Sequence, residues 1–427
     1  MGAPKFILAG PSERQQYLTH NYNDNSIRFV LNYPGLIDPA ALKASVKKII
    51  DSVDILHGSF FLDNLNAYWR INEEMDEIHY FHYMRCSGDP AETAYSASLF
   101  PVFSEDRVQL RVWLVQSDVA SSVVVVISHL VCDGSDGKYL LNKIIEGYNM
   151  YLSTGTVDAL EVKNGSRAPE KLYSHMGVKE VMGLMGNPIP DAKSLYPYPN
   201  EEPGMVRYLR KVIPADVMAA ARKKAKTIGA SANDLLVAAL NQAYGELPGV
   251  DRTQPISVTS MMDLRKHCKE GESEGLCNMS GTMPTLMKDG ICDTYEETLK
   301  EITAQTAAIK EDPKAGLYGM PLIHSATRNV PMGLMLKTAG KMYEKVSLGL
   351  TNLGNIRCAD YAMGGIVPTG GFFGGPVKKK PGMQVAVMSF DGECVLAVCG
   401  QFTDEDAVML QSTLDTMVGY IENYGRE

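Results

Sequence analysis

The chain has 427 residues, of which 45% are hydrophobic and 21% charged, and this composition excludes a disordered chain or a fibrous repeat. Its 41 Lys and Arg against 50 Asp and Glu leave a net charge of −9, so we expect neither a nucleic-acid partner nor attraction to an anionic membrane. At about 150 residues per domain, the length favours two or three domains.

No apolar run approaches the roughly 20 residues that a spanning helix needs, so no membrane span is expected. The first ten residues hold a single Lys and a short apolar patch, which is too little for a secretory signal. The eight cysteines are scattered without a Cys-x-x-Cys pair, which argues against a zinc site and a disulfide framework. These features predict reduced thiols, a cytoplasmic location and no bound metal.

The first part of the chain predicts strands interrupted by helices. A helix begins at Pro39 with Asp38 as its cap, and its apolar side chains follow helical spacing as far as Ile50. The run 123–128 is so uniformly apolar that it predicts a strand buried on both faces. The other elements expected here are strands at 27–33, 56–62, 67–71 and 108–115 and a helix at 137–152.

A similar order returns after a stretch rich in Gly, Pro, Ser and Asn that carries a weak helix at 178–185. We therefore expect an N-terminal lobe at 1–160, a connecting segment at 161–204 and a C-terminal lobe at 205–427. The second lobe is predicted to hold strands at 206–213, 256–262 and 346–350, helices at 214–228, 232–244 and 405–424, and a hairpin of 384–390 with 394–401 that turns at Asp391-Gly392.

The sharpest local feature is His129-Leu130-Val131-Cys132-Asp133-Gly134, between the buried strand and the next helix. A strand end holds a side chain rigidly, and an imidazole can take a proton from an alcohol or amine near neutral pH. Asp133 is expected to pin the loop by pairing with a cation, and Gly134 to let the chain turn closely into the helix. The alternative is a strand-end His held by backbone contacts beside a helix-capping Asp.

This motif resembles the active-site motif of the superfamily of chloramphenicol acetyltransferase, peptide-synthetase condensation domains and alcohol or amine acyltransferases. Further segments resemble the family in the same order, at 36–42, 55–60, 231–239, 261–265 and 351–354. The resemblance implies an α+β fold of two chloramphenicol-acetyltransferase-like α/β sandwich lobes. It also implies a channel at their junction, with His129 midway along it.

The implied activity is transfer of an acyl group from a thioester of coenzyme A, or of a phosphopantetheinyl carrier protein, to a small-molecule alcohol or amine. His129 would be the general base, and no cofactor would be bound permanently. Asp133 would form a structural ion pair with Arg265, for which a bidentate guanidinium is well suited because it fixes orientation as well as charge.

The sequence also departs from the family. Condensation domains usually carry two adjacent histidines, and here Ser128 replaces the first; the Asp-Phe-Gly-Trp-Gly segment of plant acyltransferases is absent. We therefore expect a free-standing, alcohol-acetyltransferase-like member. The alternatives are a stand-alone condensation enzyme that forms an amide from a carrier-bound thioester, and a non-catalytic member that binds an acyl or peptidyl ligand.

Weaker signals supply further candidates for the channel. Ser128, Asn352 and Gly371 are candidate lining residues, although Asn352 is equally well explained as a turn residue before Gly354. The glycine-rich run 370–375 is expected to be a mobile loop near the channel.

Two lysines follow that run. Lys378 and Lys379 could contact the phosphates of coenzyme A or of a phosphopantetheine arm, or form a solvated loop tip. Cys132, although it lies inside the motif, is expected to pack in the core rather than act as a nucleophile.

Overall fold

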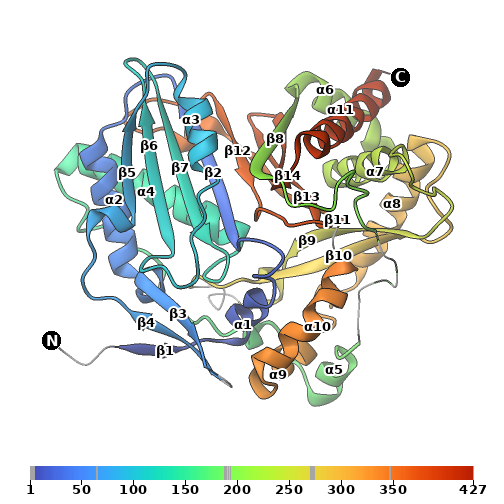
Figure 1. Cartoon of the computed structure of the whole chain (residues 1–427), viewed down its shortest axis with the longest axis horizontal. Coiled ribbons are helices and arrows are strands. Elements are labelled where there is room, and N and C mark those ends of the chain that lie inside the picture. The colour runs from blue at the N-terminus through green and yellow to red at the C-terminus, as the bar shows by residue number, and fades with distance from the viewer. Residues whose placement is uncertain are drawn as a thin grey trace.

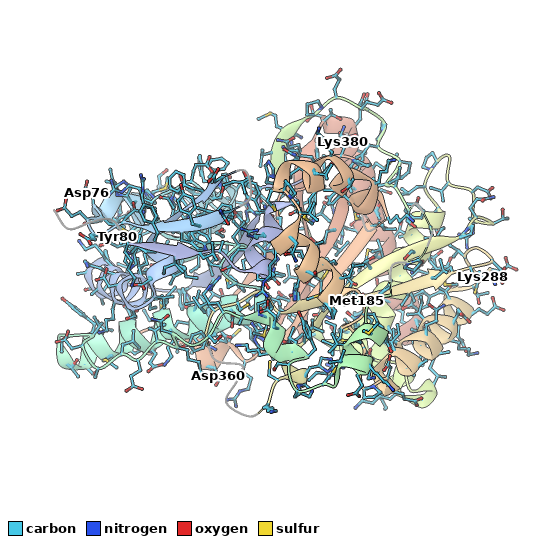
Figure 2. All side chains as sticks on the ribbon, turned by 90° about the horizontal axis from the view of Figure 1, so that it is seen from below. Asp76, Tyr80, Met185, Lys288, Asp360 and Lys380 are labelled. Carbon is cyan, nitrogen blue, oxygen red and sulfur yellow. The ribbon has the colours of Figure 1, made fainter. Side chains whose placement is uncertain are left out.

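The strands gather into two large sheets, one in each of two lobes that lie side by side (Figure 1). The structure is a computed structural model that describes residues 5–63, 66–186, 190, 192, 194–269, 275–345 and 348–426. Figure 2 shows the molecule from below, with Asp76 and Tyr80 at the end of one lobe and Lys288 at the far end of the other. The predicted two-lobed α+β fold is confirmed. Within the described residues, no helix is both long and apolar enough to cross a membrane.

The N-terminal lobe is built on a five-stranded sheet in the order β12-β2-β7-β6-β5. All eight residues of β7 are buried, as its apolar run predicts, because it pairs with β2 on one edge and with β6 on the other. The strands of this sheet are β2 (Ser26–Tyr33), β5 (Phe81–Arg85), β6 (Leu110–Gln116), β7 (Ser121–Ser128) and β12 (Gly370–Gly374).

Helices cover both faces of this sheet. Phe373 contacts Phe29 on the face where Gly137 of α4 packs, whereas the neighbouring Phe372 contacts Tyr95 of α3. Because successive residues of a strand point to opposite faces, α3 and α4 lie on opposite sides. The other elements of this half are α1 (Pro11–Tyr17), α2 (Pro39–Ser52), α3 (Pro90–Ala97), α4 (Gly134–Thr154) and a small sheet of β1 (Phe6–Leu8), β3 (Gly58–Leu62) and β4 (Ala67–Ile71).

The C-terminal lobe has a six-stranded sheet in the order β10-β9-β11-β13-β14-β8. Its strands are β8 (Met205–Ile213), β9 (Ile256–Asp263), β10 (Ser280–Met287), β11 (Leu348–Ile356), β13 (Met383–Phe390) and β14 (Glu393–Phe402). Its helices, with α5 (Val178–Gly183) in the connecting segment, are α6 (Ala215–Ala225), α7 (Ala232–Gly245), α8 (Tyr295–Glu311), α9 (Met320–Asn329), α10 (Met332–Glu344) and α11 (Asp404–Arg426). Residues 346 and 347 of the strand expected at 346–350 lie outside the described residues.

One apolar core joins the two lobes. Ala386 and Met388 of β13 belong to the core of the N-terminal lobe, whereas the alternate residues Val385 and Val387 pack in the separate core beneath α6, α7 and α11. The inner face of the C-terminal sheet therefore packs against the N-terminal lobe, and the lobes cannot separate without exposing apolar surface to water.

The glycine-rich run is not the mobile loop that its composition predicts. Residues 370–374 form the buried strand β12, which pairs antiparallel with β2 and places Gly371 opposite Leu31. A Cβ atom at Gly371 would lie 1.8 Å from the carbonyl oxygen of Val30, so glycine is needed for this close approach. A segment from the range expected for the C-terminal lobe thus completes the N-terminal sheet.

Gly371→Ala is therefore expected to lower the free energy of unfolding by about 1–3 kcal/mol, because a backbone carbonyl cannot move aside as a side chain can. Gly183→Ala in α5 is the matched control, since the added Cβ would meet no atom within 4 Å; its stability should stay within about 0.5 kcal/mol. Urea unfolding of both variants makes the comparison. Equal stabilities would contradict the pairing of β12 with β2.

Candidate active site

His129 is anchored where β7 ends, next to the start of β2. Its backbone N–H donates to the carbonyl of Asn25 at 2.6 Å, one residue beyond the last paired residues, Ser26 and Ser128. Asn25 has φ 49°, a left-handed conformation that asparagine adopts more readily than most residues. The imidazole is thus presented from a paired strand end, and the residue keeps part of its surface accessible to solvent.

Two polar groups lie within hydrogen-bond distance of one ring nitrogen of His129. Nδ1 lies 2.8 Å from the carbonyl oxygen of Cys132, which only accepts, so this shorter contact favours the tautomer with the proton on Nδ1. The amide Nδ2 of Asn278 lies 3.2 Å from the same ring nitrogen and donates to Gln16 Oε1 at 3.3 Å. The lone pair of Nε2 is therefore left for a proton from a substrate.

The surroundings favour the neutral form of this imidazole. Burial lowers the pKa of His129 from its ordinary value of 6.5; the Asp133 carboxylate and the Cys132 carbonyl oppose the change, and the positive charge of Lys378 adds to it. A neutral imidazole near pH 7 can act as a base without first losing a proton.

Asp133 has the two roles that the sequence suggests. Its Oδ1 caps α4 by accepting from the N–H groups of Ser135 and Asp136, and its Oδ2 accepts from the N–H of Met279 and from Arg265 Nη1 at 2.9 Å. The capping explanation and the ion pair with Arg265 are thus both present. The carboxylate ties the start of α4 in one lobe to β9 and β10 in the other.

Arg265 forms the ion pair with Asp133 that the resemblance implies, but it is shared among several carboxylates rather than bidentate to one. Its Nη1 bridges Asp133 at 2.9 Å and Asp263 at 3.1 Å, while Nη2 reaches Asp136 at 2.9 Å and donates to the carbonyl of Cys277 at 3.0 Å. The reason is the crowding of carboxylates: burial and the neighbouring Asp133 raise the pKa of Asp136, and a guanidinium shared among them offsets their repulsion.

Gly134 and Asn352 lie at the contact between the lobes. A Cβ atom at Gly134 would lie 2.5 Å from Leu353 Cδ2, so glycine permits close contact with β11 as well as the turn into α4. Asn352 Oδ1 accepts from the N–H of Gly354 at 2.8 Å, and Gly354 has φ 77°. This hydrogen bond makes Asn352 a turn residue before Gly354, which is the alternative explanation that the sequence offers for it.

The structure buries Ser128 and does not bring Gly371 to the imidazole. Ser128 is fully buried, and its Oγ accepts from the N–H of Leu130 at 3.4 Å. Gly371 is paired with Leu31, five residues along β2 from Ser26, or about 17 Å away. It borders a separate hollow of about 330 Å³.

Lys378 and Lys379 differ in their surroundings. The backbone of Lys378 forms bridges to Asn23 and to Gly400, and its side chain is partly buried, so it is not part of a solvated loop tip. Lys379 is exposed. Cys132 is fully buried, and burial raises the pKa of its thiol well above the ordinary value, which agrees with a packing role.

Sequence reasoning missed the polar groups that surround His129. Asn278 and Gln16 come from opposite halves of the chain, and nothing in their local sequence marks them. The sequence does carry a turn signal at Asn25, because the run Asn23-Asp24-Asn25-Ser26 is rich in turn-forming residues directly before a strand. Among the residues that the structure describes, no three His, Cys, Asp or Glu side chains gather in a way that could hold a metal ion.

No family model matches the chain, and no curated protein matches it in sequence. Solved structures are similar over almost its whole length. The TRI3 trichothecene 15-O-acetyltransferase from Fusarium sporotrichioides has a TM-score of 0.71 at 11% identity, covering 98% of this chain and 96% of that one. The epimerization domain from the third module of tyrocidine synthetase B has a TM-score of 0.65 at 15% identity, covering 100% and 98%.

A variant of the starter condensation domain of rhizomide synthetase RzmA, in complex with C8-CoA, has a TM-score of 0.66 at 11% identity, covering 99% of this chain and 95% of that one. These likenesses are in fold. The chain has the two-lobed fold of condensation domains and chloramphenicol-acetyltransferase-like proteins, as the resemblance predicts.

Proposed function

We propose that the chain is an acyltransferase that moves an acyl group from a thioester to an alcohol or amine, with His129 as the general base. The observation that carries the proposal is the contact of His129 Nδ1 with the Cys132 carbonyl at 2.8 Å, which favours the tautomer with a free Nε2. A histidine held in this way has one free basic nitrogen and little freedom to turn. The proposal includes a channel at the junction of the lobes through which both substrates reach this ring.

The chemistry needs no covalent enzyme intermediate. The hydroxyl or amine of the acceptor attacks the thioester carbonyl while His129 Nε2 takes its proton. The tetrahedral intermediate collapses, the carbon–sulfur bond breaks, and the leaving thiolate takes that proton from the imidazolium. The products are an ester or amide and a free thiol, and His129 returns to its neutral form.

The donor is proposed to be acyl-CoA or an acylated phosphopantetheinyl carrier, used as a co-substrate, and the acceptor a small molecule. The fold supports this proposal, because similar structures include an acetyltransferase and a condensation domain in complex with C8-CoA. Lys379, which is exposed, is a proposed contact for the donor's phosphates.

Release of free thiol tests the proposal and separates its alternatives. Acetyl-CoA, longer acyl-CoAs and an acylated carrier protein are each mixed with the chain and with a panel of alcohols and amines. Acceptor-dependent thiol release from an acyl-CoA supports the free-standing acyltransferase, and release from the acylated carrier alone supports the condensation enzyme. Binding of a donor without release under any condition would contradict catalysis.

The pH profile is expected to follow the titration of His129. Because burial holds the pKa of His129 below 6.5, kcat/KM should rise as the imidazolium loses its proton at an apparent pKa below 6.5, and then stay level through pH 7.5. Activity is lost as pH falls because the protonated ring cannot accept a proton. An alcohol acceptor is used, since an amine would add its own titration. An apparent pKa of about 7.5 or more would contradict the assignment.

A further inference from the structure

Lys378 brings a positive charge to the surroundings of His129. Its backbone pairs with Asn23, two residues from the Asn25 carbonyl that holds the backbone of His129. Its N–H donates to the Cys399 carbonyl at 3.0 Å, and its own carbonyl accepts from Gln401 at 3.0 Å. The lysine is thus fixed between the two lobes, and its charge lies close enough to lower the pKa of His129.

The ammonium of Lys378 has no carboxylate within ion-pair distance among the described residues. Asp24 is the nearby acid, but its Oδ2 pairs with Arg28, and its Oδ1 accepts from the N–H groups of Ser26 at 3.1 Å and Val377 at 3.0 Å. Burial lowers the pKa of Lys378 to about 8 in spite of Asp24. A partly buried cation without a bound counterion is costly, and an arriving anion would relieve that cost.

Two further polar groups without partners belong to Tyr343, whose ring faces this cation, and to Gln384, which contacts Gly375, three residues before Lys378. Lys378 Nζ lies 5.6 Å from the centre of the Tyr343 ring, which stacks on Tyr22 at 4.6 Å. Tyr343 is 8% exposed, and its hydroxyl has no hydrogen-bond partner. Gln384 Oε1 also has no partner and lies 3.0 Å from the position that a Cβ of Gly375 would take. Buried polar atoms normally have partners, so a cation with two free polar groups has the composition of a binding subsite.

We propose that Lys378, together with the hydroxyl of Tyr343 and the amide of Gln384, binds an anionic group, a carboxylate or phosphate, of a substrate that reacts at His129. The inference deepens the proposed function by naming a substrate class. The phosphates of coenzyme A are a poorer fit, because the pantetheine arm holds them far from the thioester, whereas Lys378 lies near the base. The anion comes either from the acceptor or from the acyl group of the donor.

Calorimetric binding separates these two sources without requiring turnover. For the acceptor, glycerol 3-phosphate is compared with glycerol, and lactate is compared with lactamide. For the acyl group, succinyl-CoA is compared with butyryl-CoA. The intact chain is expected to bind at least one anionic probe ten times or more tightly than its neutral counterpart. Lys378→Met and Lys378→Gln should reduce that preference by about 10- to 100-fold, the usual effect of losing a charge-assisted hydrogen bond.

Lys341→Met is the matched control, because Lys341 is an exposed lysine on α10, the helix that carries Tyr343. It removes the same charge and should keep the preference. The absence of a preference for any anion, or an equal preference in the Lys378 variants, would overturn the proposal. Thiol release with neutral acceptors, without any preference for anions, would reject the subsite but leave the proposed acyl transfer intact. A preference for anions without thiol release would support the subsite and reject acyl transfer.

Discussion

His129→Ala is expected to lower kcat/KM for acyl transfer by about 10²- to 10⁴-fold, the usual contribution of a positioned general base. The loss should fall on kcat rather than on donor binding, because the imidazole handles the acceptor proton in the transition state. The measurement is thiol release with an acyl-CoA and a responsive acceptor, across the range of both substrates.

Stability must be followed with the same variant. The ring keeps one hydrogen bond to the Cys132 carbonyl, and the anchoring bond to Asn25 comes from the backbone, so the melting temperature should change by only a few degrees. His175→Ala is the matched control, since His175 is an exposed histidine of the connecting segment. Full activity in His129→Ala would remove the imidazole from the mechanism.

Arg265→Met is expected to lower the free energy of unfolding by about 3–5 kcal/mol and to reduce kcat/KM at least tenfold. The side chain of Arg265 is 16% exposed and that of Asp133 3%, so the substitution leaves buried carboxylates without their cation. Because the ion pair joins the two lobes, its loss also disturbs the start of α4 and the loop that holds His129.

Two further variants test whether the loss of stability comes from the buried ion pair. Asp133→Asn in the Arg265→Met background removes one uncompensated charge and should recover part of the stability. Arg357→Met breaks an exposed pair with Asp360 and should change the stability by less than about 1 kcal/mol. Urea unfolding of the series gives the energies. A stability and activity of Arg265→Met equal to those of the unaltered chain would show that the bridge has no role.

The sequence predicts those parts of the fold whose signals are local. The apolar run of β7, the Asp38 cap of α2 and the turn at Asp391-Gly392 are all present where expected. The ion pair of Asp133 with Arg265 is not local; the resemblance implies it, and the structure has it. The local structure of a short segment can thus be predicted from its own residues.

The features that the sequence does not predict depend on partners far away in the chain. Gly371 is indistinguishable from a loop glycine until Val30 is known to lie against it. The three-carboxylate bridge of Arg265 follows from the meeting of α4 with β9, and Asn278 reaches His129 only because the lobes dock. Lys378 resembled a solvated lysine in sequence and is partly buried for the same reason.

The most direct test is to search for an acylated acceptor by mass spectrometry while free thiol is titrated in the same reaction. Direct transfer governed by one imidazole predicts one product molecule per thiol released, no acyl adduct on the protein, and almost no product with His129→Ala. A stable acyl adduct on the intact chain, or product formed equally well without His129, would contradict the account.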